Sequence, residues 1–217
     1  MIVLNLKTYD RTLEKALYFT DIVSEVVAET GVRIVICPPA PFFKDAAERF
    51  SDVFAQHVDA ESPGAFTGSV PAELLKRIKV KGSIVNHSEK KLRPHDKIKA
   101  TIERLHQNAL EGLVCAESAK EAELVASFHP TYIAIEPPEL IGSGISVSNA
   151  KPEIVTETIK KIKAVNDKIP VLCGAGVSNA EDVKKALGLG VDGVLLASAF
   201  VKAEDPKKFL SELAAMF

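Results

Sequence analysis

Short apolar segments alternate with longer segments of helical period along the whole chain. Residues 2–6 are mostly apolar, and residues 11–29 repeat apolar side chains at helical spacing until Gly31, which is placed to end a helix. This order of strand then helix occurs eight times. Strands are predicted at residues 2–6, 32–37, 53–56, 83–86, 113–115, 132–135, 171–173 and 191–196. Helices are predicted at residues 11–29, 42–50, 71–79, 95–109, 119–128, 152–165, 180–187 and 206–215.

Several of the predicted strands are largely apolar instead of alternating with polar residues, as at Val3-Leu4 and in residues 191–196. Strands that are buried on both faces have this pattern, which is typical of a parallel sheet covered by helices. Eight such units can close into a barrel that has no edge strand. No Gly-x-Gly-x-x-Gly follows the first strand, which disfavours an open doubly wound sheet. We therefore predict an α/β fold, a (β/α)8 barrel that forms a single domain over residues 1–217.

Composition narrows the class of protein. Of 217 residues, 47% are hydrophobic, which is enough for a large core, and 27 basic residues against 29 acidic ones argue against nucleic acid as the main partner. Apolar runs are far shorter than the ~20 residues that span a bilayer, and the first residues do not resemble a secretory signal. Three widely spaced cysteines favour neither a disulfide framework nor a zinc site. We expect a cytoplasmic protein with no membrane partner.

The chemistry of such a barrel lies at the carboxyl ends of its strands, so the residues that follow each strand are the candidates. Asn5 and Lys7 follow the first strand, and strand alternation predicts that both point into the barrel mouth. A lysine in that position implies an anionic ligand or a buried acid. Taken alone, the pair is more often a strand-terminal lysine that reaches solvent.

A histidine stands directly at the end of the fourth strand. His87 is followed by Ser88 and Glu89, which could open a helical turn. Backbone N–H groups at a helix start disfavour the imidazolium, so His87 is predicted to be neutral and to donate a hydrogen bond. The alternative is a core histidine bonded to a backbone carbonyl.

The sixth strand ends in an acid and a long loop. Glu136 follows four apolar residues, so it starts from a low-dielectric setting in which a carboxyl pKa rises, as suits a general base. Pro137 holds Glu136 extended. The loop continues to Pro152 through Gly142 and Gly144, and its prolines, glycines and length predict a lid.

Small residues follow the last two strands. Gly174-Ala175-Gly176 and Ala197-Ser198-Ala199 would let backbone N–H groups approach an anion closely. Gly-Ala-Gly alone could be a tight turn. Barrels often bind phosphate with the loops after strands seven and eight, so the two segments together indicate a phosphate site.

These groups suit one kind of chemistry, proton abstraction next to a carbonyl on a small phosphorylated substrate. Glu136 would remove the proton, Lys7 and His87 would stabilise the enediolate, and the lid would exclude water. No metal-ligand cluster, nucleophile elbow or dinucleotide fingerprint is apparent in the sequence, so we expect no cofactor and no metal.

Motifs along the whole chain resemble the triosephosphate isomerase family, in its short archaeal type. They are Asn5-Leu6-Lys7, Ala55-Gln56-His57-Val58, Gly64-Ala65-Phe66-Thr67-Gly68, Asn86-His87-Ser88-Glu89, Glu136-Pro137 through Gly144, Gly174–Val177 and Ala197-Ser198. The resemblance implies the cofactor-free interconversion of dihydroxyacetone phosphate and D-glyceraldehyde 3-phosphate, in glycolysis and gluconeogenesis. It implies a glutamate base beside a neutral histidine, a pairing for which this family is itself the standard example.

The resemblance also implies a role for each residue that occupies a functional position of the family's motifs. Glu136 is implied as the base, His87 as the electrophile, Lys7 as the stabilising cation, Asn5 as a substrate ligand, and Glu89 as the acid that orients Lys7 and the His87 segment. The resemblance implies phosphate contacts from backbone amides at Ile141 or Gly142, and at Gly176, Ala197 and Ser198.

The sequence departs from the family pattern at three places, one of which is the replacement near Gly176 of a serine that is common in the loop after the seventh strand. Pro138-Glu139 stands in the lid hinge where many members have a tryptophan, and Asn86 stands where glycine is frequent. The long loop from Ala60 to Val70 has an apolar tip, which by resemblance docks into a second subunit, with Thr67 reaching the neighbour's pocket. We expect a homo-oligomer, either a dimer or a tetramer.

Two other functions are compatible with this kind of barrel. One is another phosphosugar isomerase or epimerase, such as the isomerase of tryptophan synthesis, and the other is a catalytically silent phosphometabolite-binding barrel. The presence together of Asn5, Lys7, His87 and Glu136 favours the triose phosphate reaction over both.

Overall fold

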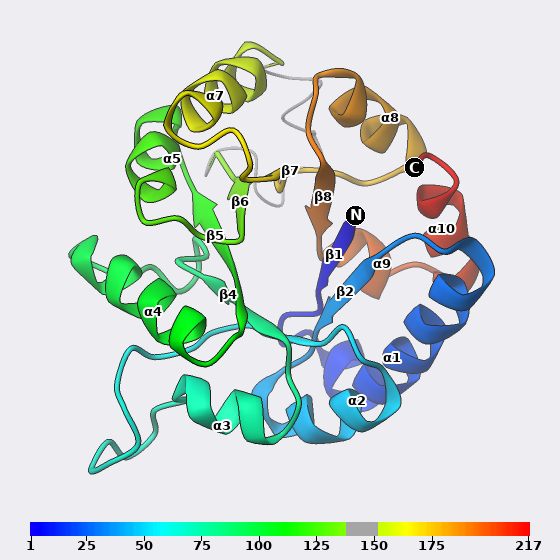
Figure 1. Cartoon of the computed structure of the whole chain (residues 1–217). Coiled ribbons are helices and arrows are strands. Elements are labelled where there is room, and N and C mark those ends of the chain that lie inside the picture. Colours follow the sequence, from blue (N-terminus) through cyan, green and yellow to red (C-terminus); the bar gives the residue numbers. More distant parts are fainter. Residues whose placement is uncertain (138–151) are drawn as a thin grey trace.

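A ring of parallel strands enclosed by helices makes up the computed structural model, which describes residues 1–137 and 152–217 (Figure 1). The strands are β1 Ile2–Asn5, β2 Ile34–Cys37, β3 Phe54–Ala55, β4 Gly82–Val85, β5 Glu111–Ala116, β6 Tyr132–Ile135, β7 Val171–Cys173 and β8 Gly193–Leu196. The helices in these ranges are α1 Asp10–Thr30, η1 Ala40–Phe42, α2 Phe43–Arg49, α3 Ala72–Arg77, α4 Asp96–Gln107, α5 Ala119–Ala126, α7 Pro152–Val165, α8 Ala180–Gly188, α9 Ser198–Val201 and α10 Pro206–Ala214.

The sheet closes on itself. Its strand order is β2-β1-β8-β7-β6-β5-β4-β3, and every named pair is parallel. A parallel bridge between Ile36 and Val53 joins the two outer strands of that order. The prediction of a (β/α)8 barrel is confirmed.

Most predicted elements occur with shifted ends. Residues 132–135, 152–165 and 171–173 form β6, α7 and β7 with the predicted bounds, and Gly31 ends α1 in the left-handed conformation. β8 starts at Gly193, two residues later than predicted, although the Asp192 N–H still donates to the Val171 carbonyl at 2.7 Å and its carboxylate accepts from the Val171 N–H at 2.8 Å. The predicted helix at 42–50 is divided between η1 and α2, and the single-turn helix α9 was not predicted.

Both faces of the strands are buried, which explains their apolar sequence. Side chains on one face, including Val3, Phe54 and Leu172, pack together inside the barrel. Side chains on the other face, including Ile36, pack against apolar helix residues such as Phe19 in α1. Alternate residues of each strand therefore belong to two different cores.

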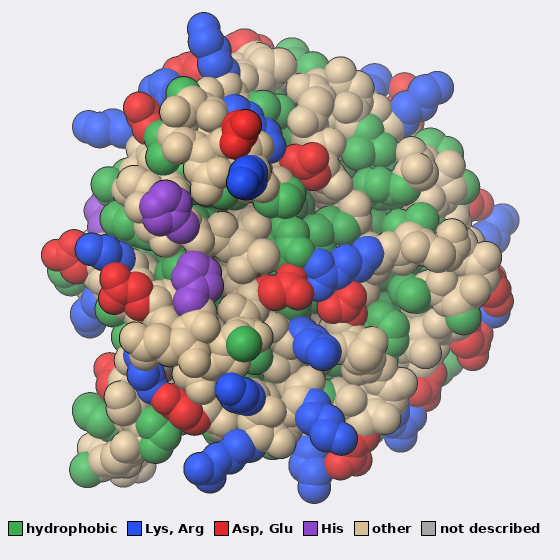
Figure 2. Space-filling view, viewed as in Figure 1, with side chains coloured by type: hydrophobic (Ala, Val, Ile, Leu, Met, Phe, Trp, Pro, Cys, Tyr) green, Lys and Arg blue, Asp and Glu red, His purple; other side chains and the backbone are tan. Residues whose placement is uncertain are grey.

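The amino end of the barrel is held by charges. Arg33 donates to Asp52, to Glu111 at 3.0 Å and to the hydroxyl of Tyr132. Figure 2, drawn from the side on which the N-terminus lies, shows charged side chains of both signs over the middle of this face. In the part of the chain that the structure describes, no helix has the length and apolar character needed to cross a membrane.

Candidate active site

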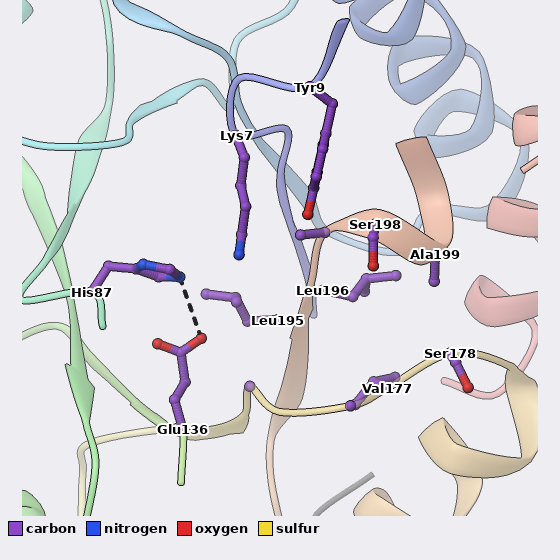
Figure 3. Close-up of a pocket in the computed structure, with 13 residues that line it drawn as sticks. Lys7, Tyr9, His87, Glu136, Val177, Ser178, Leu195, Leu196, Ser198 and Ala199 are labelled. Carbon is purple, nitrogen blue, oxygen red and sulfur yellow. Dashed lines mark ion pairs between the residues drawn. The ribbon is translucent and has the colours of Figure 1, made fainter. Parts of the chain in front are cut away.

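Several strands end at one cavity of about 150 Å³. Six of the residues predicted from the sequence line it, namely Lys7, His87, Glu136, Gly176, Ala197 and Ser198. Figure 3 shows Lys7 reaching the cavity from above, His87 from the left, Glu136 from below and Ser198 from the right. The barrel thus brings together side chains that are up to 191 positions apart in the sequence.

Glu136 reaches the cavity because strand alternation continues one residue beyond β6. Tyr132 and Ala134 point into the barrel, so Glu136 does as well, and its N–H donates to the Ala116 carbonyl at 2.8 Å. Its side chain is buried, and burial raises the pKa of its carboxyl. Among the described residues its Oε2 is buried and has no hydrogen-bond partner.

The room for Glu136 comes from the neighbouring strand end. A Cβ at Gly174 would lie 2.6 Å from Cγ of Glu136, closer than side chains pack. The glycine after β7 therefore has a structural role in addition to its predicted place in a phosphate loop.

His87 is held as the neutral Nε2–H tautomer. Its Nδ1 accepts a hydrogen bond from the Glu89 N–H at 3.1 Å, so the ring proton is on Nε2, which lies 3.6 Å from Oε1 of Glu136. The prediction that a helix start at Ser88 keeps His87 neutral was wrong. No helix begins at Ser88, since α4 starts at Asp96. The single backbone N–H of Glu89, which lies in a turn, keeps the proton off Nδ1 instead.

Asn86 anchors the segment that carries His87. Its backbone is left-handed, with φ of 60°, a conformation that asparagine tolerates better than most non-glycine residues. Its side-chain amide donates to the Cys115 carbonyl at 2.9 Å and to the buried carboxylate of Glu121, and its Oδ1 accepts from the Leu92 N–H at 3.0 Å. The departure from glycine at this position thus ties the His87 turn to the end of β5.

Lys7 also has a left-handed backbone, with φ of 48°. Lys7 lines the cavity at the barrel mouth, as predicted, but the turn after β1 directs its side chain, because the strand itself ends at Asn5. Oδ1 of Asn5 accepts from the Lys7 N–H at 3.1 Å, and the Gln56 side chain donates to the Lys7 carbonyl at 3.2 Å. Nζ of Lys7 lies 2.7 Å from Oε1 of Glu89, the pairing that the resemblance implied.

Asn5 itself is not among the residues that line the cavity of Glu136. It lines an adjacent cavity of about 220 Å³, and Lys7 and His87 line both cavities. Its contact with the Lys7 backbone gives it a part in shaping the site, while a direct contact with substrate stays a prediction.

The predicted phosphate loops lie across the cavity from His87 (Figure 3). Gly176 has φ of 71°, and Ala197 and Ser198 begin the single turn of α9. Their small side chains leave the backbone open to the cavity. Ile141, Gly142 and the predicted lid from Pro138 to Gly144 lie outside the described residues.

Sequence reasoning missed Tyr9, whose side chain also lines the cavity. Its place in the sequence could have indicated this, because Tyr9 follows closely after the end of β1 at Asn5, where the chain turns across the barrel mouth. The three cysteines are buried, and desolvation raises the pKa of the Cys37 and Cys115 thiols, as expected for fillers and not for nucleophiles. Within residues 1–137 and 152–217, no three His, Cys, Asp or Glu side chains are grouped as metal ligands would be.

Comparison with known proteins agrees with this geometry. The sequence model of the family Triosephosphate isomerase matches residues 1–215. The chain is 45% identical over 215 residues to the triosephosphate isomerase of Methanothermus fervidus, covering 98% of this chain and 96% of that protein. It is 42% identical over 215 residues to that of Methanocaldococcus jannaschii, with 98% of each chain covered. To the enzyme of Archaeoglobus fulgidus it is 40% identical over 221 residues, with 100% and 97% covered.

Proposed function

The chain belongs to the triosephosphate isomerase family, and from that premise we propose that Glu136, His87 and Lys7 carry out the family's reaction. This reaction interconverts dihydroxyacetone phosphate and D-glyceraldehyde 3-phosphate, a step of glycolysis and gluconeogenesis. The observation that carries the assignment is the 3.6 Å approach of His87 Nε2 to Glu136 Oε1 at the edge of a cavity that Lys7 also lines.

Glu136 is the base. Its carboxylate takes a proton from the carbon next to the carbonyl of dihydroxyacetone phosphate, and the electron pair of the broken C–H bond forms the C=C bond of an enediolate. The hydroxyl proton on that carbon passes to the former carbonyl oxygen, relayed by Nε2 of His87. The protonated Glu136 gives its proton to the neighbouring carbon, and the product is the aldehyde. A buried carboxyl suits both steps, because burial raises its pKa and so makes the carboxylate a stronger base than an exposed one.

His87 and Lys7 stabilise the charge that develops on oxygen. The Nε2–H of His87 points toward Glu136 and can donate to both substrate oxygens. The Lys7 ammonium supplies the positive charge, and Glu89 holds it in place at 2.7 Å. Because these donors are in position before the reaction starts, they need little reorganisation as the enediolate forms.

The phosphate lies at the opposite side of the cavity. Backbone N–H groups at Gly176, Ala197 and Ser198 would hold it, together with an amide of Ile141 or Gly142 from the lid. Glycine and alanine at these positions support the proposal, since they let an anion reach the backbone. A substrate anchored there would place its carbonyl carbon between Glu136 and His87.

Steady-state kinetics on D-glyceraldehyde 3-phosphate test the assignment. Replacing Glu136 by Gln keeps the size of the side chain and removes the base, so kcat should fall by at least ~10³-fold, or about 4 kcal/mol in barrier height. The matched control is E157Q in α7, an exposed glutamate far from the cavity, which should leave kcat unchanged. Turnover of the Glu136 variant within about threefold of wild type, under ~1 kcal/mol, would show that Glu136 is not the base.

A second part of the proposal concerns assembly. The loop from Ala60 to Val70 projects from the barrel between β3 and α3, and hydrophobic side chains lie at its tip (Figures 1 and 2). Phe66 in that tip is 51% exposed, and Asp59 pins the base of the loop by accepting from the Val70 N–H at 2.7 Å. A rigid loop with an apolar tip supports a homo-oligomer in which the loop enters the cavity beside Gln56 and His57 of a second copy.

Light scattering after gel filtration tests the assembly. We expect the mass of a dimer or a tetramer for the wild type and a smaller species for F66D, since an aspartate would lose the apolar contact. L124D in α5 is the control, because it changes an exposed apolar residue outside the loop. A monomeric wild type at micromolar concentration would contradict the proposal. For localisation, three buried cysteines without a disulfide support a reducing compartment such as the cytoplasm.

A further inference from the structure

Tyr9 directs a phenol into the active-site cavity, and none of the steps above uses it. Figure 3 shows its hydroxyl pointing into the same space as the Lys7 ammonium and the Ser198 hydroxyl. In the described part of the chain, no residue forms a hydrogen bond with this hydroxyl. A phenol O–H that lines a polar cavity in this way is available to a ligand.

Contacts on several sides fix the position of Tyr9. Tyr9 is the N-cap residue of α1 and has an extended backbone, and its carbonyl accepts from the N–H groups of Thr12 at 2.8 Å and Leu13 at 3.0 Å. The ring packs against the apolar core, and Nζ of Lys202 lies 5.6 Å from the ring centre. A helix start on one side and a cation on the other therefore hold the ring, so little side-chain entropy is lost when its hydroxyl binds.

We propose that the Tyr9 hydroxyl donates a hydrogen bond to the phosphate group of the bound triose phosphate, which makes Tyr9 a substrate-binding residue. The inference rests on the proposed phosphate position near Ala197 and Ser198. These residues offer backbone donors, and the Lys7 ammonium is already paired with Glu89 at 2.7 Å. A phosphate dianion has three terminal oxygens, so an uncharged donor held at the cavity wall adds a charge-assisted hydrogen bond that this wall otherwise lacks.

The same geometry keeps Tyr9 out of the proton transfers. Its hydroxyl enters from the side of the cavity opposite Glu136 (Figure 3), whereas His87 lies 3.6 Å from that carboxylate. A group that contacts only the phosphate holds substrate and transition state to a similar degree. Loss of the hydroxyl should therefore raise KM and leave kcat nearly unchanged.

The test is Y9F, which removes only the hydroxyl, beside Y18F, which makes the same change on the exposed face of α1. Inorganic phosphate serves as a competitive inhibitor that contains the recognised group and lacks the triose. A lost hydrogen bond to a charged group predicts about a tenfold rise in KM and in the phosphate inhibition constant, with kcat within about twofold. Y18F should match the wild type.

Absorbance gives a readout that does not depend on turnover. The chain has no tryptophan and three tyrosines, and Tyr18 and Tyr132 lie away from the cavity. Phosphate added to the wild type should produce a saturable tyrosine difference spectrum that Y18F retains and Y9F loses. An unchanged phosphate inhibition constant and spectrum in Y9F would overturn the proposal. If the wild type binds phosphate in this way but turns over no triose phosphate, the proposed function fails and the role of Tyr9 as a phosphate ligand stands.

Discussion

A single methyl group added at Gly174 should displace the base, although no catalytic residue is itself substituted. The Cβ of G174A would lie 2.6 Å from Cγ of Glu136 and 3.3 Å from its Cδ and Oε1. Ordinary van der Waals contact begins at 3.4 Å, so the Glu136 side chain must move by about 0.8 Å (3.4 − 2.6). The Gly174 N–H, which donates to the Ile135 carbonyl at 2.9 Å, is kept in the alanine variant.

The magnitude follows from how steeply proton transfer depends on placement. A displacement near 1 Å of a catalytic group costs on the order of 100-fold in rate, about 2.7 kcal/mol in the barrier. We expect kcat of G174A to fall by roughly this factor. KM should change much less, because the phosphate loops do not depend on where Glu136 points.

Steady-state kinetics in both directions and thermal melts of the same samples provide the measurement. G188A at the end of α8 is the matched control, since a Cβ there meets nothing within 4 Å, and its kcat should equal that of the wild type. A G174A protein that folds as the wild type does and retains kcat within about threefold would refute the reasoning, because a drop that small is under ~1 kcal/mol.

Three further predictions concern the other site residues. The pKa of Glu136 is raised in the folded state, so E136Q should be more stable than the wild type at neutral pH. This difference in the free energy of unfolding should grow as pH rises through the folded-state pKa and vanish below the ordinary carboxyl value of 4.5. Denaturant titrations at several pH values that show no difference would contradict the prediction. K7A should lose turnover while its far-UV circular dichroism is unchanged, and a fully active variant would remove Lys7 from the mechanism. N86A should have a lower melting temperature than N86G, because an alanine in the left-handed conformation costs ~1 kcal/mol. Both variants lose the hydrogen bond to the Cys115 carbonyl, so both should have a reduced kcat. A kcat equal to that of the wild type would show that Asn86 does not position His87.

Much of the site was predictable because strand ends in a parallel barrel converge. Glu136 directly follows β6 and His87 comes two residues after β4, so their convergence at one mouth followed from counting strands. The small residues at 174–176 and 197–199 could be placed in the same way. The reason for the tautomer of His87 was not predictable. A turn and a helix start have similar local sequences, and only the three-dimensional path of residues 87–89 shows which N–H meets the ring.

Contacts between distant parts of the chain were beyond the sequence pattern. Asn86 binds Glu121 from 35 positions away, and Gly174 makes room for Glu136 across two strand ends. The left-handed turn at Lys7 and the entry of Tyr9 into the cavity depend on how α1 leaves β1.

The order and spacing of apolar residues thus determined the fold, the end of the barrel that carries the chemistry, and most of the reacting groups, because burial of both strand faces leaves a strong periodic signal. The tertiary structure alone decided distances, the tautomer, the exposure of Phe66 and the direction of Tyr9. Those quantities depend on side chains from different units meeting in space, and no local pattern encodes where two such side chains meet.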